Sequence, residues 1–128
     1  MTRGPSASSR RALGRRGEQL AERFLRGHGL RILARNVHLR HAEIDLVALD
    51  GDVLCIVEVR LRTGSNFGTA RESVDARKRR RLGAAASELL ATRRLPRHRS
   101  LRFDVVAIDA SVEPPRIEHL RDAFALTR

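Results

Sequence analysis

An Asp-Gly pair between two apolar runs is the feature that most constrains how this chain folds. The run at residues 43–49 leads into Asp50 and Gly51, and a second run at residues 53–62 leads out. A tight turn between antiparallel strands needs residues that tolerate positive φ, and Asp-Gly meets that need. The pattern therefore predicts a β-hairpin near the middle of the chain.

The predicted hairpin brings two carboxylates, Asp45 and Glu58, onto one face. If the loop is Asp50-Gly51, Asp45 lies opposite Ile56 and diagonal to Glu58. If the loop is Gly51-Asp52, Asp45 lies directly opposite Glu58. The Cβ atoms are roughly 7–8 Å apart in the diagonal arrangement and about 5 Å apart in the opposed one. Both registers place the two acids close together, and the sequence leaves the choice between them open.

Two carboxylates this close on a half-buried sheet repel each other unless a proton or a cation neutralises them, and a divalent metal is the simplest neutraliser. The alternative is that both are solvated on the wet face of the hairpin. Alternation weighs against it, because Leu54 and Ile56 share a face with Glu58 and Arg60. The opposite face is also apolar: Val53, Cys55, Val57 and Val59. A strand that is apolar on both sides is expected to be covered on both sides, which favours a site.

The charge balance predicts a polyanionic partner, with nucleic acid as the default. The net charge is +11, and the 26 basic residues include a single lysine, Lys78. A compositional bias of the genome explains the preference for arginine over lysine, but not the excess of base over acid. With four Phe and no Tyr or Trp, the stacking platforms of single-strand binders are largely missing. Duplex or branched DNA is therefore the expected partner.

The cysteine content and hydropathy bear on the compartment. A single cysteine excludes an internal disulfide and fits a reducing cytoplasm. Cys55 lies in the most apolar run, so it is expected to be a buried small side chain rather than a nucleophile. No apolar run approaches the length of a membrane span, so no membrane association is expected.

The remaining elements predict an α/β fold in which helices flank a mixed sheet, in the order α-β-β-β-α-β. Residues 1–9 are expected to be a disordered basic tail, and residues 10–128 a single domain. The expected elements are a helix at 10–27, a strand at 30–36, the hairpin, a helix at 70–94, a strand at 101–109 and a short edge strand at 117–120. The turn-rich loop 63–69 is expected to close over the carboxylate end of the hairpin, and residues 121–127 to form a tail or final turn.

Two helical side chains are further candidates for the site. Glu18 lies along the edge of the apolar stripe of the first helix, where leaning toward the sheet and pointing to solvent are equally compatible with the pattern. Lys78 falls on the inward stripe of the second helix, between Val74 and Leu82. It either snorkels to water or reaches a site on the sheet. The arginines around it are expected to contact phosphates, with a solvated face as the alternative: Arg71, Arg77, Arg79, Arg80 and Arg81.

Five segments resemble a known family when they are taken in series. Asp45, twelve residues, then Glu58-Val59-Arg60 resembles the PD-(D/E)xK nuclease pattern of acid, spacer, acid, one residue and usually lysine. More specifically, the order and spacing are similar to the YraN family of Holliday-junction-resolvase-like proteins. The matching segments are Gly17-Glu18, Ala42-Glu43-Ile44-Asp45-Leu46, Val57-Glu58-Val59-Arg60, Phe67-Gly68 with Lys78 beyond, and Arg102-Phe103-Asp104-Val105-Val106.

The resemblance implies a restriction-endonuclease-like fold and a role for each matched position. Asp45 and Glu58 would hold Mg²⁺ or Mn²⁺, with the carbonyl of Val59 as a further ligand, and Glu18 would complete the acidic site. Arg60 occupies the place of the lysine that positions water and stabilises the transition state. For Glu43 and Asp104, structural hydrogen bonding is the expectation. Resemblance to resolvases also implies a homodimer, because cutting both strands of a symmetric junction needs two sites.

Two departures from the family pattern bear on activity. Ala42 stands where the family usually has glycine. Arg60 replaces lysine, and a guanidinium is wider, planar and unable to give up its proton. One hypothesis is that Lys78 supplies the missing ammonium, which requires its Nζ to lie near the two carboxylates.

The sequence thus supports more than one class of function. The leading expectation is a metal-dependent nuclease that acts on structured or branched DNA in recombination or repair. A non-catalytic nucleic-acid-binding protein on a nuclease scaffold is the alternative, favoured by Arg60 and by the net charge. A protein that binds structured RNA is a third possibility.

Overall fold

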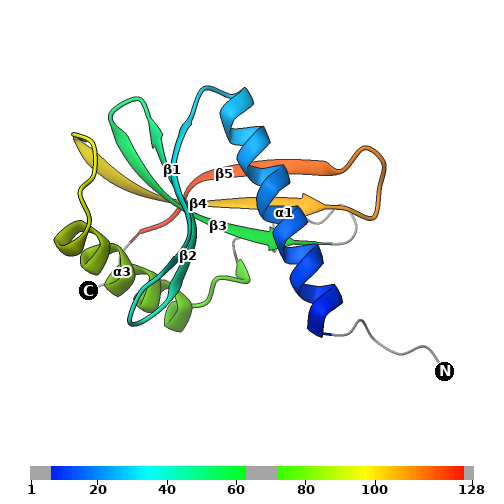
Figure 1. Cartoon of the computed structure of the whole chain (residues 1–128), viewed down its shortest axis with the longest axis horizontal. Coiled ribbons are helices and arrows are strands. Elements are labelled where there is room, and N and C mark those ends of the chain that lie inside the picture. The colour runs from blue at the N-terminus through cyan, green and yellow to red at the C-terminus, as the bar shows by residue number, and fades with distance from the viewer. Residues whose placement is uncertain (1–6, 63–71, 126–128) are drawn as a thin grey trace.

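The computed structural model describes residues 7–62 and 72–125, with the side chains of 14–62 and 72–125. Its elements follow the chain in the order α1 (Ala7–Gly27), β1 (Arg31–His38), β2 (Glu43–Asp50), β3 (Val53–Leu61), α3 (Ala76–Thr92), β4 (Ser100–Asp109) and β5 (Arg116–Phe124). Figure 1 shows the long α1 running across the strands, with α3 on the other side of the sheet. The predicted α/β class is confirmed, and the arrangement is consistent with a restriction-endonuclease-like core.

The sheet is mixed, with its strands in sequence order β1-β2-β3-β4-β5. Three of its four pairings are antiparallel, while β3 and β4 run parallel. Parallel neighbours need a long crossover, and α3 lies on the connection between β3 and β4. The predicted hairpin is formed by β2 and β3, which places the end of β3 near the centre of the sheet.

Each face of the sheet packs against one helix. Ala21 and Leu25 of α1 pack with Cys55 and Val57. On the other face, Leu82, Ala85 and Leu89 of α3 pack with Leu54 and Ile56. The four residues from Leu54 to Val57 are all at most 2% exposed, which confirms that β3 is covered on both sides. A charge at the end of this strand is therefore removed from much of the solvent.

Both helices begin at positions other than those expected. The first was expected to begin at Arg10, but α1 already includes Ala7. The second was expected to begin at Ala70, but α3 begins at Ala76. Asp75 is extended and caps it, because its side chain accepts a hydrogen bond from the backbone N–H of Lys78. The tail residues 1–6, the loop at 63–69 and Arg71 lie outside the described residues.

The last strand is longer than predicted, and the expected tail or turn after Leu120 is wrong through Phe124. The reason is packing: Phe124 is buried, and its ring stacks on that of Phe103 at 5.0 Å between centroids. A register shift in the β4–β5 ladder accompanies a positive φ at Asp122, whose N–H donates to the Asp104 carboxylate. Because most residues of this segment are polar, the sequence pattern did not indicate that Phe124 lies in the core.

The expectations for Cys55 and for membrane spans can both be compared with the structure. Cys55 is fully buried, and burial, reinforced by the charge of Asp104, raises the pKa of its thiol to about 12. The prediction of a buried, unreactive side chain is confirmed. Within residues 7–62 and 72–125, no helix has both the length and the apolar character needed to cross a bilayer.

Candidate functional site at the end of the central hairpin

The turn between β2 and β3 selects one of the two predicted registers. Asp50 pairs with Val53, so the loop is Gly51-Asp52, and Gly51 has a φ of +62° at the first loop position. That position favours glycine in a type II′ turn. The ladder runs on to Leu46 opposite Val57. One step further along this register, Asp45 faces Glu58.

The backbone ladder is replaced by a side-chain contact at this point. The N–H of Val59 donates to Oδ2 of Asp45 at 2.8 Å. This hydrogen bond fixes the carboxylate of Asp45 at the end of the β2–β3 ladder and orients it toward β3. Asp45 and Glu58 thus meet where the two strands separate.

Both carboxyl groups of this pair resist ionisation. Burial, followed by the negative charge of Asp45, raises the pKa of Glu58 to about 7. Burial likewise raises the pKa of Asp45, partly offset by the hydrogen bond from Val59. The negative charge of Asp45 contributes to the raised pKa of Glu58, so a proton on one carboxyl group relieves the repulsion between the two. A bound cation would relieve the same repulsion.

Two cations flank Glu58 without forming close hydrogen bonds. Nζ of Lys78 lies 3.9 Å from Oε2 of Glu58, and Nη2 of Arg60 lies 3.9 Å from Oε1. The positive charge of Lys78 lowers the pKa of both Glu58 and Asp45, so it acts on the pair. Oε2 of Glu58 is buried, and no described residue donates a hydrogen bond to it. The structure therefore brings Lys78 to the carboxylates, as the hypothesis of a substitute ammonium requires.

Glu18 of α1 leans toward the sheet and joins the same pocket. Burial, followed by the charge of Asp45, raises the pKa of Glu18, while a hydrogen bond with Asn36 opposes the rise. The pocket has a volume of about 280 Å³, and Gly14 and Val59 also line it. Of the two orientations that the sequence left open for Glu18, the structure selects the inward one.

Asn36 is a residue of this site that the sequence analysis missed. It lies in β1 with a φ of +51°, a conformation that asparagine tolerates better than most side chains. Its side chain makes the hydrogen bond to Glu18. The available signal was an asparagine as the last residue of the predicted strand, a residue type that strands disfavour.

The donor set fits a hard divalent cation such as Mg²⁺ or Mn²⁺. Asp45 and Glu58 offer carboxylate oxygens, one of them buried and unpartnered, and Val59 lines the same pocket. Magnesium is commonly held by one or two carboxylates, with waters and substrate phosphates completing the shell. Among the described residues, no three His, Cys, Asp or Glu side chains come close enough together to hold an ion by themselves. Two carboxylates supplemented by backbone, water or substrate oxygens are the arrangement that fits.

The arginines expected to contact phosphates do not share one environment. Arg77, Arg80 and Arg81 are exposed on α3. Arg79 is half-buried: its Nε donates to the carbonyl of Val74 at 2.7 Å, and its guanidinium lies 5.2 Å from the centroid of the Phe124 ring. Arg79 is thus engaged within the fold, whereas the other three are free to face a partner.

The two acids expected to be structural differ in burial. Asp104 is fully buried and accepts hydrogen bonds from the guanidinium of Arg102, from His119 and from the N–H of Asp122. Burial opposes its ionisation, but these hydrogen bonds prevail and lower its pKa. The structural hydrogen bonding predicted for Asp104 is confirmed. Glu43 is more exposed and lies 3.9 Å from Nε2 of His38.

Comparison with known proteins identifies relatives across most of the chain. The model of the uncharacterised protein family UPF0102 matches residues 17–108. A UPF0102 protein of Rhodococcus opacus is 49% identical over 115 residues, which are 88% of this chain and 96% of that protein. One from Pelotomaculum thermopropionicum is 45% identical over 120 residues, or 92% and 99% of the two chains. The matched region contains the whole hairpin with Glu18, Lys78 and Asp104. The chain therefore belongs to UPF0102, the YraN family, as its sequence motifs predicted.

Proposed function

We propose that this protein is a metal-dependent nuclease that cuts structured or branched DNA. The observation that carries the proposal is the facing pair Asp45 and Glu58 at the end of the hairpin, with one buried carboxylate oxygen lacking a hydrogen-bond partner. Two adjacent carboxylates repel each other and destabilise the fold, so a purely structural role does not account for them. Binding of a cation would remove the repulsion and explain why both acids are present.

Each residue of the site would have a separate role in phosphodiester hydrolysis. Asp45 and Glu58 would hold Mg²⁺ or Mn²⁺ with the Val59 carbonyl, and the ion would supply positive charge to the scissile phosphate and acidify the attacking water. Asp45 is kept in position by the N–H of Val59. Lys78 and Arg60, each 3.9 Å from Glu58, direct positive charge to the place where negative charge grows on the phosphate. Glu18, which lines the same pocket, would accept a proton or hold a water through its carboxylate.

The surroundings of the pocket support a DNA substrate. Arg77, Arg80 and Arg81 are exposed on α3, the same helix that carries Lys78 to the pocket. Contacts of this kind with phosphates are independent of base sequence and suit a duplex or a branch. The proposal extends to a cytoplasmic protein acting in recombination or repair, and to a homodimer that presents two sites to a junction.

A non-catalytic DNA-binding protein is the second candidate. It is favoured by the guanidinium of Arg60 at the position that the nuclease pattern reserves for lysine, since arginine does not release its proton. The same surface arginines would then bind a junction without cutting it.

Scission of a labelled four-way DNA junction in Mg²⁺ or Mn²⁺ tests the proposal. The wild type should cut the junction, and Asp45→Asn/Glu58→Gln should bind it but leave it intact. Asp52→Asn is a matched control, because Asp52 is an exposed carboxylate in the turn of the same hairpin. Binding without scission by the wild type, at all metal concentrations, would favour the second candidate. Stronger competition by duplex RNA than by the unlabelled junction would point to an RNA-binding protein.

A further inference from the structure

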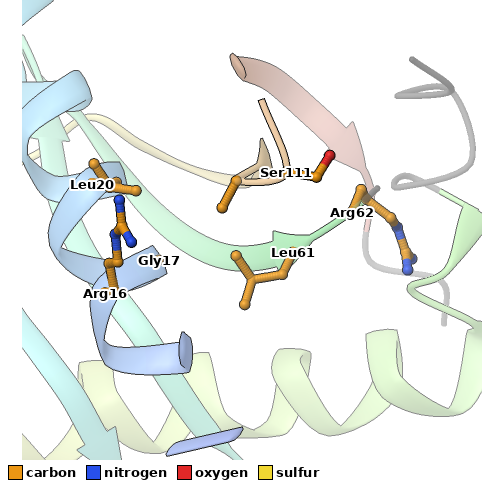
Figure 2. A pocket seen from close by; sticks show the side chains of 7 residues that line it. Arg16, Gly17, Leu20, Leu61, Arg62 and Ser111 are labelled. Atoms are coloured by element: carbon orange, nitrogen blue, oxygen red, sulfur yellow. The ribbon is translucent and has the colours of Figure 1, made fainter. Parts of the chain in front are cut away.

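A second hollow lies next to the acidic pocket, between α1 and the end of β3. Its volume is about 440 Å³. Figure 2 shows Leu61 reaching into the space between α1 and the turn that carries Ser111. The lining residues come from α1, from the end of β3 and from the β4–β5 turn: Arg16, Gly17, Leu20, Leu61, Arg62, Ala110 and Ser111.

The lining combines an apolar floor with a cationic edge. Leu20, Leu61 and Ala110 form the floor, and Leu61, the last residue of β3, remains 38% exposed. Arg16 and Arg62 stand at the edge, and no acid is among the lining residues. Within the described chain neither arginine forms an ion pair, and the buried Nε of Arg62 has no hydrogen-bond partner. The hollow therefore offers unsatisfied positive charge beside apolar surface.

The walls of the hollow are held in place by close packing on one side and by hydrogen bonds on the other. A Cβ atom at Gly17 would lie 3.0 Å from Cδ2 of Leu61, so the glycine lets Leu61 lie directly against α1. On the opposite wall, the backbone N–H and the hydroxyl of Ser111 both donate to Oδ1 of Asp109. These hydrogen bonds hold the turn in place. A hollow with fixed walls needs little reorganisation to receive a ligand.

The hollow adjoins the carboxylates through the end of β3. Leu61 and Arg62 line both the hollow and the acidic pocket. Leu61 follows Glu58 by three residues, which corresponds to about 10 Å along a strand. Stacked nucleotides are about 3.4 Å apart along a duplex strand, so the hollow lies within a few nucleotides of the carboxylate pair.

We propose that this hollow binds one unpaired nucleobase of the DNA, an inference that rests on the proposed nuclease function and specifies its substrate. A nucleobase has apolar faces for Leu20 and Leu61, and the phosphates on either side of it are suited to Arg16 and Arg62. An arginine guanidinium also stacks on bases, which compensates for the absence of aromatic residues among the lining side chains. A base inside an intact stack cannot enter, so the hollow favours branch points, flaps and single-stranded ends.

The test compares three labelled duplexes in EDTA, so that neither metal binding nor scission is required. One is blunt, one carries two unpaired thymidines at one end, and one carries two abasic nucleotides there. The abasic tail has the same phosphates without the bases. The wild type should bind the thymidine tail about five- to tenfold more tightly than the abasic tail, at the lower end of what one or two stacked bases contribute.

Two pairs of variants test whether the preference for the thymidine tail arises from the hollow. Ala110→Trp places a large side chain in the hollow, whereas Val112→Trp places the same side chain in the same turn outside it. Arg16→Glu and Arg23→Glu make equal changes of charge on α1, and only Arg16 lines the hollow. The preference for thymidine should disappear in Ala110→Trp and Arg16→Glu and persist in Val112→Trp and Arg23→Glu.

The outcomes separate this inference from the function on which it rests. Equal binding of the thymidine and abasic tails by the wild type, or a preference that survives in both hollow variants, would overturn the nucleobase site alone. Failure to bind any of the three duplexes at low salt would overturn the proposed DNA-directed function together with it. A change in oligomeric state in Ala110→Trp, without any change in DNA binding, would assign the hollow to a second copy of the chain and overturn the inference.

Discussion

The Glu58→Gln substitution should stabilise the protein at alkaline pH. Burial and the neighbouring charge of Asp45 raise the pKa of Glu58 from 4.5 to about 7. Glutamine has the size of a protonated glutamic acid and, like it, can donate a hydrogen bond, but it does not ionise. The variant therefore isolates the free energy needed to hold a negative charge at this position.

The magnitude follows from the two pKa values. A carboxyl group whose pKa is raised in the folded state stabilises the protein fully below its unfolded pKa, and this contribution is lost as the pH rises through the folded value. For Glu58 the window runs from 4.5 to about 7. At about 1.4 kcal/mol per pKa unit, the free energy of unfolding of the wild type should fall by about 2–3 kcal/mol between pH 5 and pH 8 because of this group.

Urea denaturation of both proteins in EDTA, at intervals from pH 5 to pH 8, measures the effect as a difference. Ionisable groups remote from the carboxyl pair are common to both proteins and cancel. The stability of Glu58→Gln relative to the wild type should therefore rise by about 2–3 kcal/mol over this range. Glu118→Gln, at an exposed position on β5, is the control and should show no such trend. Parallel pH profiles for the wild type and Glu58→Gln would refute the burial and coupling on which the site is argued.

Three further predictions concern the cations and the buried network. Lys78→Gln should reduce junction scission by about 10²-fold, as expected for loss of one group that stabilises a transition state. Arg60→Lys should retain scission. Unchanged scission by Lys78→Gln would exclude a catalytic role for Lys78. Asp104→Asn should cost about 3–5 kcal/mol in urea denaturation because it leaves Arg102 without its buried partner, against less than about 1 kcal/mol for the exposed Asp52→Asn. Replacing the exposed arginines of α3, Arg77, Arg80 and Arg81, by glutamine should weaken junction binding and make it less dependent on salt. The slope of log K against log salt concentration should fall by about one unit per lost phosphate contact, and an unchanged slope would place the DNA elsewhere.

The sequence predicted the hairpin and the meeting of its two acids because both depend on local geometry. Strand alternation and a turn that requires positive φ restrict Asp45 and Glu58 to one face in either register. The choice of register depended on which residue takes the positive φ, and Gly51 takes it at the first loop position. That choice follows from the energetics of one dihedral angle and has no separate signal in the pattern.

Features that depend on distant packing were not predictable in the same way. Arg79 contacts the ring of Phe124, a residue that the sequence assigned to a tail or final turn and that the structure places in the core. The orientation of Glu18 likewise depends on Asn36, eighteen residues further along the chain, in a left-handed conformation. Helical periodicity put Lys78 on the inward face, but only the packing of α3 on the sheet shows that Nζ reaches Glu58. Periodicity thus predicts the face of an element, and tertiary contacts decide which atoms meet.

Calorimetric titration of the wild type with Mg²⁺ at pH 7, in two buffers of different ionisation enthalpy, tests the central claim most directly. If the carboxyl pair holds the ion, binding should release about half a proton, because the pKa of Glu58 is about 7. Asp45→Asn/Glu58→Gln should then show no binding heat. Absence of Mg²⁺ binding by the wild type, or equal binding by the double variant, would contradict the account.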